Sequence, residues 1–356
     1  MNPITEQEKE FIRKQRNEEY AETRRKQEWF RAMQEFPYEM KLQHAVMRAQ
    51  QFYKVIREEY NANVHVSVGG LDSITLYLFV KEYVNPDIKG VSVSSIEDKS
   101  NQRVHKELGI ISVSPAKSKK DVIKEFGYPV ISKDIAGKLD MLQNPTERNA
   151  TVRHAILTGE TGKLGGYRHS DRMMMPKKWR ELFIERKAPF QVSAKCCYYL
   201  KEKPCDTWAR QNNSFPYLGL MASEGGRRSR LLPINGCNMF TPSTKRSCPF
   251  AIFNRQDLLQ LALDLRAPVP EIYGTIERSP SGMLYTTRAQ RTGCSFCGFG
   301  IHLDKRPHHF DMLREDNPKE WKLWMYEMGW GKVLTYIGVQ WEDVPKHQHH
   351  FQWLQP

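Results

Sequence analysis

The chain has 356 residues, of which 40% are hydrophobic, and a formal net charge of +13 at pH 7. It can bury one large core or two modest ones. The absence of any run of eighteen apolar residues and the charged amino terminus exclude a membrane-spanning helix and a signal peptide, so we expect a soluble, cytoplasmic protein. The seven cysteines are then expected to be reduced ligands or buried thiols. The excess positive charge favours an anionic partner, either a nucleic acid or a nucleotide-like substrate, although a solvated basic surface is the alternative.

Residues 1–39 are predicted to form a charged helical arm. Acidic and basic residues balance each other in this segment, which favours a solvated helix over an electrostatic tail for nucleic acid. From Met40 to Tyr60 the apolar residues keep helical spacing. This second helix is expected to pack on a sheet just before the next strand.

Residues 64–80, VHVSVGGLDSITLYLFV, predict a buried strand, a glycine turn and an apolar helix. Three valines alternate at the period of a strand, and a helix-compatible apolar pattern follows the turn. Gly69 and Gly70 let the backbone approach a ligand, and the N–H groups of the following helix favour phosphate or another anion. An ordinary strand-to-helix turn is the alternative.

Strands and helices continue to alternate after this turn. GVSVSS at 90–95 and GIISVS at 109–114 predict two further strands, and 119–126 predicts a short helix before the strand-like YPVISK at 128–133. The alternation predicts an α/β fold with a doubly wound, mostly parallel sheet and a ligand crevice at the carboxyl ends of its strands.

A basic region follows at about 147–190 and is predicted to be an insertion. Basic residues are interleaved with Tyr167, Trp179 and Phe183, a combination that suits phosphate contacts and base stacking on a single strand or an extruded base of DNA or RNA. A solvated basic face is the equally weighted alternative.

The region 191–310 contains two cysteine groups, Lys195-Cys196-Cys197 and TGCSFCGFG with Cys294 and Cys297. A Cys-x-x-Cys in glycine-rich sequence brings two thiolates to one centre, and a distant vicinal pair can supply two more. Thiolate ligands favour zinc or an iron–sulfur cluster, and the spacing does not separate these two. Buried, inert thiols are the alternative.

The loop GGLDS, placed between a strand and a helix, resembles the pyrophosphate loop, usually SGGxDS, of the N-type ATP pyrophosphatases and of the phosphoadenosine phosphosulfate (PAPS) reductase family. Val68 stands where that loop has its leading serine, and Leu71 stands where the reductase branch has lysine. GYPVISKDIAGKL is similar to a segment of phage- or prophage-borne PAPS reductase-like proteins. The resemblance spans about 40–339 and implies an adenine nucleotide alpha hydrolase-like fold. It also implies a site for ATP or a related adenine nucleotide, made by Ser67, Gly69, Gly70, Asp72, Ser73, Arg227 and Arg228.

The cysteine pattern resembles that of assimilatory adenylylsulfate (APS) reductases and of the sulfurtransferase of DNA phosphorothioation. The resemblance implies a four-iron four-sulfur (4Fe-4S) cluster, with zinc as the alternative. Cys205 and Cys237 are substitute ligands in this interpretation, and Cys248, beside Pro249, is expected to be structural. The implied ligands are Cys196, Cys197, Cys294 and Cys297.

Taken with the resemblance, residues 40–340 are expected to form a PAPS reductase-like domain, and 341–356 a polar tail with three histidines. The implied function is adenylation-dependent sulfur transfer to, or modification of, a nucleic acid, with a sulfur-donor or regulatory protein as a further partner. A non-catalytic regulator with an altered nucleotide site is the alternative. A sulfonucleotide reductase is less favoured because Cys297 is the last cysteine, so the mobile carboxyl-terminal nucleophile of those enzymes has no counterpart.

Overall fold

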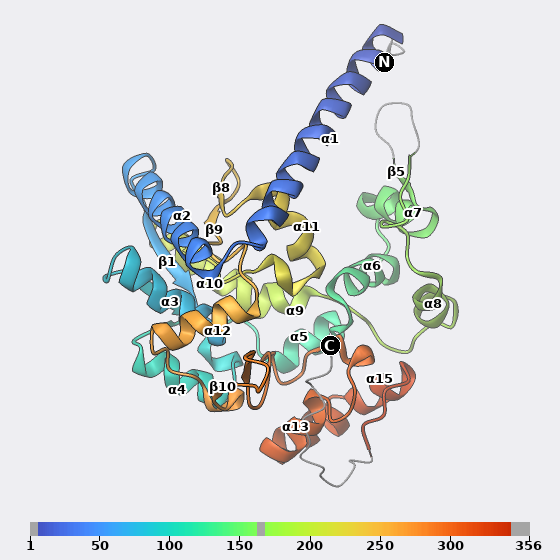
Figure 1. Cartoon of the computed structure of the whole chain (residues 1–356). Helices are drawn as coiled ribbons and strands as arrows, with labels where there is room; N and C mark the ends of the chain where they lie inside the picture. The colour runs from blue at the N-terminus through green and yellow to red at the C-terminus, as the bar shows by residue number, and fades with distance from the viewer. Residues whose placement is uncertain (1–5, 162–167, 343–356) are drawn as a thin grey trace. The chain divides into compact units, whose positions relative to one another are not determined.

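The computed structural model describes residues 6–161 and 168–342, and shows a mixed α/β protein (Figure 1). The chain divides into two compact units, each built from two separate stretches of sequence. Unit 1 consists of Met1–Ser114 and Cys205–Thr292, and unit 2 consists of Pro115–Pro204 and Gly293–Pro356. Across the described residues, no helix has both the length and the apolar content that a membrane span requires.

A six-stranded sheet with the strand order β3-β2-β1-β7-β9-β8 forms the centre of unit 1. Every neighbouring pair is parallel except β8 and β9, so the predicted mostly parallel sheet is confirmed. The central strand β1 is in register with both neighbours: Val66 lies opposite Gly90 of β2 and Tyr217 of β7. The strands are β1 (Asn63–Ser67), β2 (Lys89–Ser92), β3 (Ile111–Ser112), β7 (Ser214–Tyr217), β8 (Asn238–Phe240) and β9 (Lys245–Ser247).

Helices pack on this sheet through one large apolar core, with Phe52, Phe79 and Phe250 fully buried in it. Helix α3 approaches the sheet closely at Gly90, where a side chain would meet the ring of Tyr77 at 3.2 Å. The α-helices of unit 1 are α1 (Glu6–Gln34), α2 (Tyr38–Glu58), α3 (Leu71–Tyr83), α4 (Lys99–Glu107), α10 (Lys203–Gln211, at the unit boundary), α11 (Gly226–Asn235) and α12 (Arg255–Asp264). Its short 3₁₀ turns include η1 (Ser94–Ile96), η5 (Ala222–Glu224) and η6 (Glu271–Tyr273), and β10 (Ile276–Arg278) pairs with β11 (Leu284–Thr286).

Helix α1 extends away from the rest of its unit (Figure 1). Phe30 and Met33, near its carboxyl end, are buried, whereas Phe11, Tyr20 and Trp29 are more than half exposed. Among the residues of α1 whose side chains are described, buried apolar packing is therefore found in the last turns.

Unit 2 is mostly helical. Its strand β4 (Val130–Ile131) pairs in parallel with β12 (Gly298–Phe299) in a two-stranded sheet of its own. The expectation that this strand continues the alternation of the large sheet is therefore wrong. The other elements are α5 (Lys119–Phe126), α6 (Lys133–Gln143), α7 (Ala150–Thr158), β5 (Glu160–Thr161), β6 (Arg168–His169), α8 (Lys177–Arg180), α9 (Lys195–Cys197), α13 (His309–Asp316), α14 (Pro318–Lys322) and α15 (Trp330–Tyr336).

Large aromatic side chains fill the core of unit 2. Phe183, Phe296, Trp324 and Trp330 are fully buried. Gly298 lies against the Trp330 ring, where an added Cβ would be 2.6 Å from a ring carbon. This close packing fixes the start of β12, and with it the turn that carries the Cys-x-x-Cys sequence.

Candidate functional site

The glycine loop lies between β1 and α3, as predicted. Strands β1, β2 and β7 are parallel neighbours, so their carboxyl ends meet at one edge of the sheet. Gly70 is the N-cap of α3, and Asp72 lies in its first turn. Ser67 is the last residue of β1 and is half-buried.

The backbone of this loop is held largely by its own unit. The Gly69 N–H donates to the Ser73 hydroxyl at 2.7 Å, and that hydroxyl donates to the Gly70 carbonyl at 2.9 Å. The Leu71 N–H donates to the Tyr273 hydroxyl at 3.1 Å. The backbone amides of Gly69 and Leu71, which we expected to face a phosphate, therefore already have hydrogen-bond partners.

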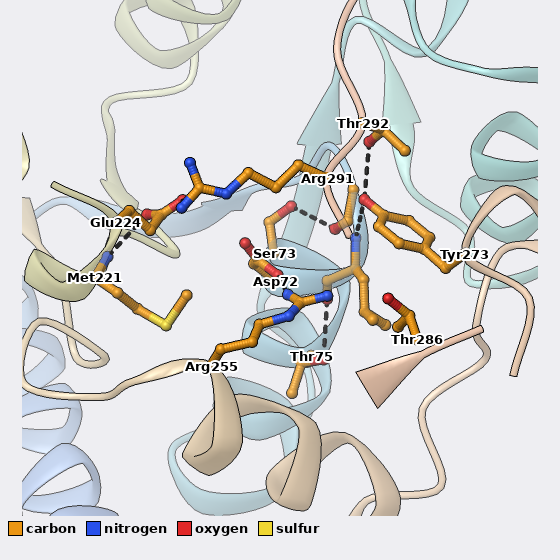
Figure 2. A network of polar contacts seen from close by, with 12 residues as sticks. Asp72, Ser73, Thr75, Met221, Glu224, Arg255, Tyr273, Thr286, Arg291 and Thr292 are labelled. Carbon is orange, nitrogen blue, oxygen red and sulfur yellow. Dashed lines mark hydrogen bonds and ion pairs between the residues drawn. The ribbon is translucent and has the colours of Figure 1, made fainter. Parts of the chain in front are cut away.

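Tyr273 also explains why Gly70 has no side chain. A Cβ built on Gly70 would be 2.1 Å from the Tyr273 hydroxyl oxygen and 2.9 Å from the Thr292 hydroxyl. Gly70 has φ −88° and ψ −165°, a conformation that any residue adopts, so glycine is required here for space. The group that approaches this glycine is the Tyr273 side chain, which is 3% exposed and hydrogen-bonded to Thr292 at 2.8 Å (Figure 2).

His105 holds the other side of the loop. Its Nε2 lies 2.7 Å from the Gly69 carbonyl oxygen, which can only accept, so Nε2 carries the proton. Burial lowers the pKa of His105, so the ring is neutral and its Nδ1 accepts from the Ser94 hydroxyl at 3.0 Å. Ser94 lies in η1, which follows β2. Ser94 thus supports the loop through His105.

Acidic and basic side chains neutralise each other beside the loop (Figure 2). Arg255 of α12 contacts Asp72 at 2.6 Å. Burial raises the pKa of Asp72, and the Glu224 carboxylate adds to this effect, while Arg255 and Arg291 oppose it. The four groups therefore form one electrostatic network.

The predicted arginines of α11 contribute to this network unequally. Arg228 forms an ion pair with Glu224, whose carboxylate also accepts from the Met221 N–H at 3.3 Å and lies 3.9 Å from Arg291. Arg227 is exposed on α11. An anionic ligand at this position would therefore compete with the Glu224 carboxylate for Arg228.

The four cysteines assigned to a metal centre all belong to unit 2. Cys196 and Cys197 lie on α9, which packs on α5. Cys294 and Cys297 form a tight turn before β12, closed by a hydrogen bond from the Cys297 N–H to the Cys294 carbonyl at 2.8 Å. None of them forms a disulfide.

These four thiols influence one another electrostatically. The pKa of Cys197 is lowered, chiefly by a hydrogen bond from the Cys196 thiol and further by Lys133 and Lys201. That same bond raises the pKa of Cys196, and the charges of Cys294 and Cys297 raise it further. Burial raises the pKa of Cys297 to about 12, with smaller contributions from Cys294 and Cys197. The two distant cysteine groups thus belong to the same unit and influence each other's pKa values.

Within the described ranges, no three or more His, Cys, Asp or Glu side chains are close enough together to hold a metal ion. The other cysteines belong to unit 1. Burial raises the pKa of Cys237 to about 12 and that of Cys248 to about 11, so both are buried neutral thiols. Cys205 lies on α10 and is half-buried.

The basic insertion does not offer the aromatic platform that its sequence predicts. Trp179 is 9% exposed and Phe183 is 1% exposed, and both pack inside unit 2. Tyr167 lies outside the described residues, as do the three tail histidines. Stacking of a base on Trp179 or Phe183 is therefore ruled out in this conformation, whereas Lys177 is exposed and lies 3.6 Å from the Glu181 carboxylate.

No family model and no curated protein matches this chain. The assignment of function therefore rests on the residues of the two candidate sites.

Sequence reasoning missed several residues of the loop site, namely His105, Glu224, Arg255, Tyr273, Arg291 and Thr292. Arg255 opens a segment with a clear helical pattern, but its ion pair with Asp72 spans 183 positions. No local pattern marks such a distant partner. Lys133, which lowers the pKa of Cys197, was missed for the same reason.

Proposed function

We propose that the chain is an iron–sulfur protein of the PAPS reductase-like type, acting in adenylation-dependent sulfur transfer to a nucleic acid. The observation that carries this proposal is that Cys196, Cys197, Cys294 and Cys297, from two distant segments of the chain, lie in one unit and influence one another electrostatically. Such a set of thiols suits a metal centre, since thiolates are the ligands of zinc and of iron–sulfur clusters.

The resemblance favours a cluster over a single zinc ion. In a 4Fe-4S cluster each of the four thiolates would bind a different iron. Lys133 and Lys201 would offset part of the negative charge of four thiolates. A bound cluster supplies electron transfer or delivery of reduced sulfur.

The loop of unit 1 would supply the nucleotide chemistry. An oxygen of the nucleic acid attacks the α-phosphorus of ATP, and pyrophosphate leaves with the electron pair of the broken bond. Sulfur at the oxidation level of sulfide then displaces AMP. Arg255 and Arg291 are the cations beside the loop that suit an anionic ligand.

A second candidate function is supported by the contacts of the loop. Because the Gly69 and Leu71 amides already have partners, the chain also suits a regulator that kept the fold and the thiol centre without nucleotide turnover. Val68 and Leu71, which replace the serine and lysine of the resembled loop, support the same candidate.

Release of pyrophosphate from ATP discriminates between the two functions. We expect the anaerobically purified protein to release pyrophosphate only when single-stranded DNA or RNA is present. Asp72→Asn should lose this activity, whereas Asp87→Asn, in an exposed turn of the same unit, should retain it. If the protein binds ATP but releases no pyrophosphate, whether nucleic acid is absent or present, the sulfur-transfer proposal is contradicted and the regulator is favoured.

A further inference from the structure

The Tyr273 hydroxyl occupies the amino-terminal end of α3. It accepts a hydrogen bond from the Leu71 N–H at 3.1 Å, so its own proton is free for the Thr292 hydroxyl at 2.8 Å. The ring packs with Leu71, Leu259 and Leu284 in a small apolar cluster. The hydroxyl is therefore held in place both by polar contacts and by packing.

This position is the one that an oxygen of an anion would take. The first N–H groups of a helix lack partners within the helix, and the positive end of the helix dipole favours negative charge there. In this chain a neutral phenol oxygen takes the Leu71 amide, and the missing side chain of Gly70 makes room for it. The loop is therefore closed by a residue of its own unit.

A second, independent observation concerns a buried polar side chain on α4. Asn101 is fully buried, and neither its amide nitrogen nor its carbonyl oxygen has a hydrogen-bond partner among the described residues. Asn101 lies four positions before His105, so both side chains occupy the same face of α4, the face that holds the Gly69 carbonyl. A buried carboxamide without partners has both donor and acceptor capacity left for a bound molecule.

Segment η6 contacts α4 next to Asn101 and also carries Tyr273, which holds the Leu71 amide. The Ile272 N–H donates to the Ser100 hydroxyl, directly before Asn101, at 3.2 Å. The next residue, Tyr273, holds the Leu71 amide. An outward movement of η6 would therefore free the amide on α3 and uncover α4 next to Asn101 at the same time.

We infer that Tyr273 is an internal competitor for the anionic ligand of the loop. Its hydroxyl holds the Leu71 amide in the structure, and a phosphate or sulfate oxygen takes that amide when η6 moves away. The inference rests on the proposed function, since it takes the loop as an adenine-nucleotide site. A competitor of this kind lowers apparent affinity, because only the fraction of molecules with the amide free is competent to bind.

Tyr273→Phe tests this inference, because it removes the oxygen and keeps the ring in the apolar cluster. ATP, AMP and inorganic pyrophosphate are titrated calorimetrically into wild type and variant. Tyr285→Phe is the matched control, since Tyr285 donates to Glu277 on the neighbouring strand β10, outside the loop site. The hydrogen bond to be released has an ordinary net strength, so the Kd of ATP should fall about three- to tenfold in Tyr273→Phe and stay unchanged in the control.

The titrations distinguish failure of the competition by Tyr273 from failure of the proposed nucleotide site. A tighter complex of Tyr273→Phe with ATP, without a change in the Tyr285→Phe control, supports the inference. Equal Kd values for ATP in wild type and Tyr273→Phe would overturn it and leave the nucleotide site of the proposed function standing. If neither folded protein binds any of the three probes, the loop is not an anion site, and both the inference and the nucleotide part of the proposed function fail.

Discussion

Gly70→Ala is the substitution that tests the packing of the loop most sharply. The new Cβ would lie 2.1 Å from the Tyr273 hydroxyl oxygen, a separation that forces the hydroxyl to move. The movement breaks its hydrogen bonds to the Leu71 amide and to Thr292 in a buried site. Two such bonds and the overpacking should lower the free energy of unfolding by about 1–3 kcal/mol.

A double-mutant cycle isolates the contact responsible. In a Tyr273→Phe background the 2.1 Å contact is gone, and the nearest remaining atoms are the Thr292 hydroxyl at 2.9 Å and the ring carbon at 3.4 Å. We expect Gly70→Ala to cost less than about 1 kcal/mol there, and the coupling free energy to be at least about 1 kcal/mol. Urea denaturation followed by circular dichroism measures all four proteins.

Gly69→Ala is the matched control. Its Cβ would meet nothing closer than the Glu97 carboxylate oxygen at 3.6 Å, an ordinary contact distance. The control should therefore change stability by less than about 0.5 kcal/mol. Equal and small effects of Gly70→Ala and Gly69→Ala would show that the space next to Gly70 is open, and would refute the assignment of Tyr273 as its occupant.

Three further predictions concern the rest of the chain. Lys41 and Asp257 form a buried ion pair at 2.9 Å. Lys41→Met leaves the Asp257 carboxylate buried without its partner, so it should lower the free energy of unfolding by about 3–5 kcal/mol, and adding Asp257→Asn should recover part of the loss. Full stability of Lys41→Met in urea denaturation would contradict this prediction. Burial lowers the pKa of His65 to about 4, below its unfolded value, so its neutral form stabilises the fold above about pH 6.5 and the contribution is lost as the pH falls towards 4. At pH 5 the loss should be about 2 kcal/mol, visible as a urea midpoint that falls more in wild type than in His65→Asn; parallel pH profiles would exclude His65 as the cause. If exposed Lys177 and its neighbour Lys178 contact phosphate, replacing both by Gln should reduce the slope of log K against log salt for single-stranded DNA by about 1.4, and an unchanged slope would leave them as solvated charges.

Local patterns in the sequence predicted the elements that carry the loop. Alternating valines and the glycine pair specify β1, the turn and α3, because strand and helix periods depend on near neighbours alone. The pattern of PVIS also correctly predicts a strand, but the expectation that this strand belongs to the large sheet is wrong. β4 pairs with β12, more than 160 residues later in the chain, and a strand signal carries no information about its partner.

The same distinction separates the residues found at the sites from those missed. The cysteine groups could be singled out because Cys-x-x-Cys and Cys-Cys are short patterns with a chemical meaning, and their role as ligands stays a prediction. Tyr273 could not be predicted, since its hydrogen bond to Leu71 spans 202 positions. The burial of Trp179 could not be predicted either, because the sequence pattern is the same for an aromatic residue that packs in a core and for one that forms a stacking surface.

The metal content of the anaerobically purified protein tests the central claim most directly. The account predicts a brown protein with about four iron atoms per chain and no stoichiometric zinc. Cys294→Ser should lose the iron, and Cys205→Ser, in the other unit, should keep it. One zinc per chain without iron, or iron that survives Cys294→Ser and is lost with Cys205→Ser, would contradict the assignment of a four-cysteine iron–sulfur centre in unit 2.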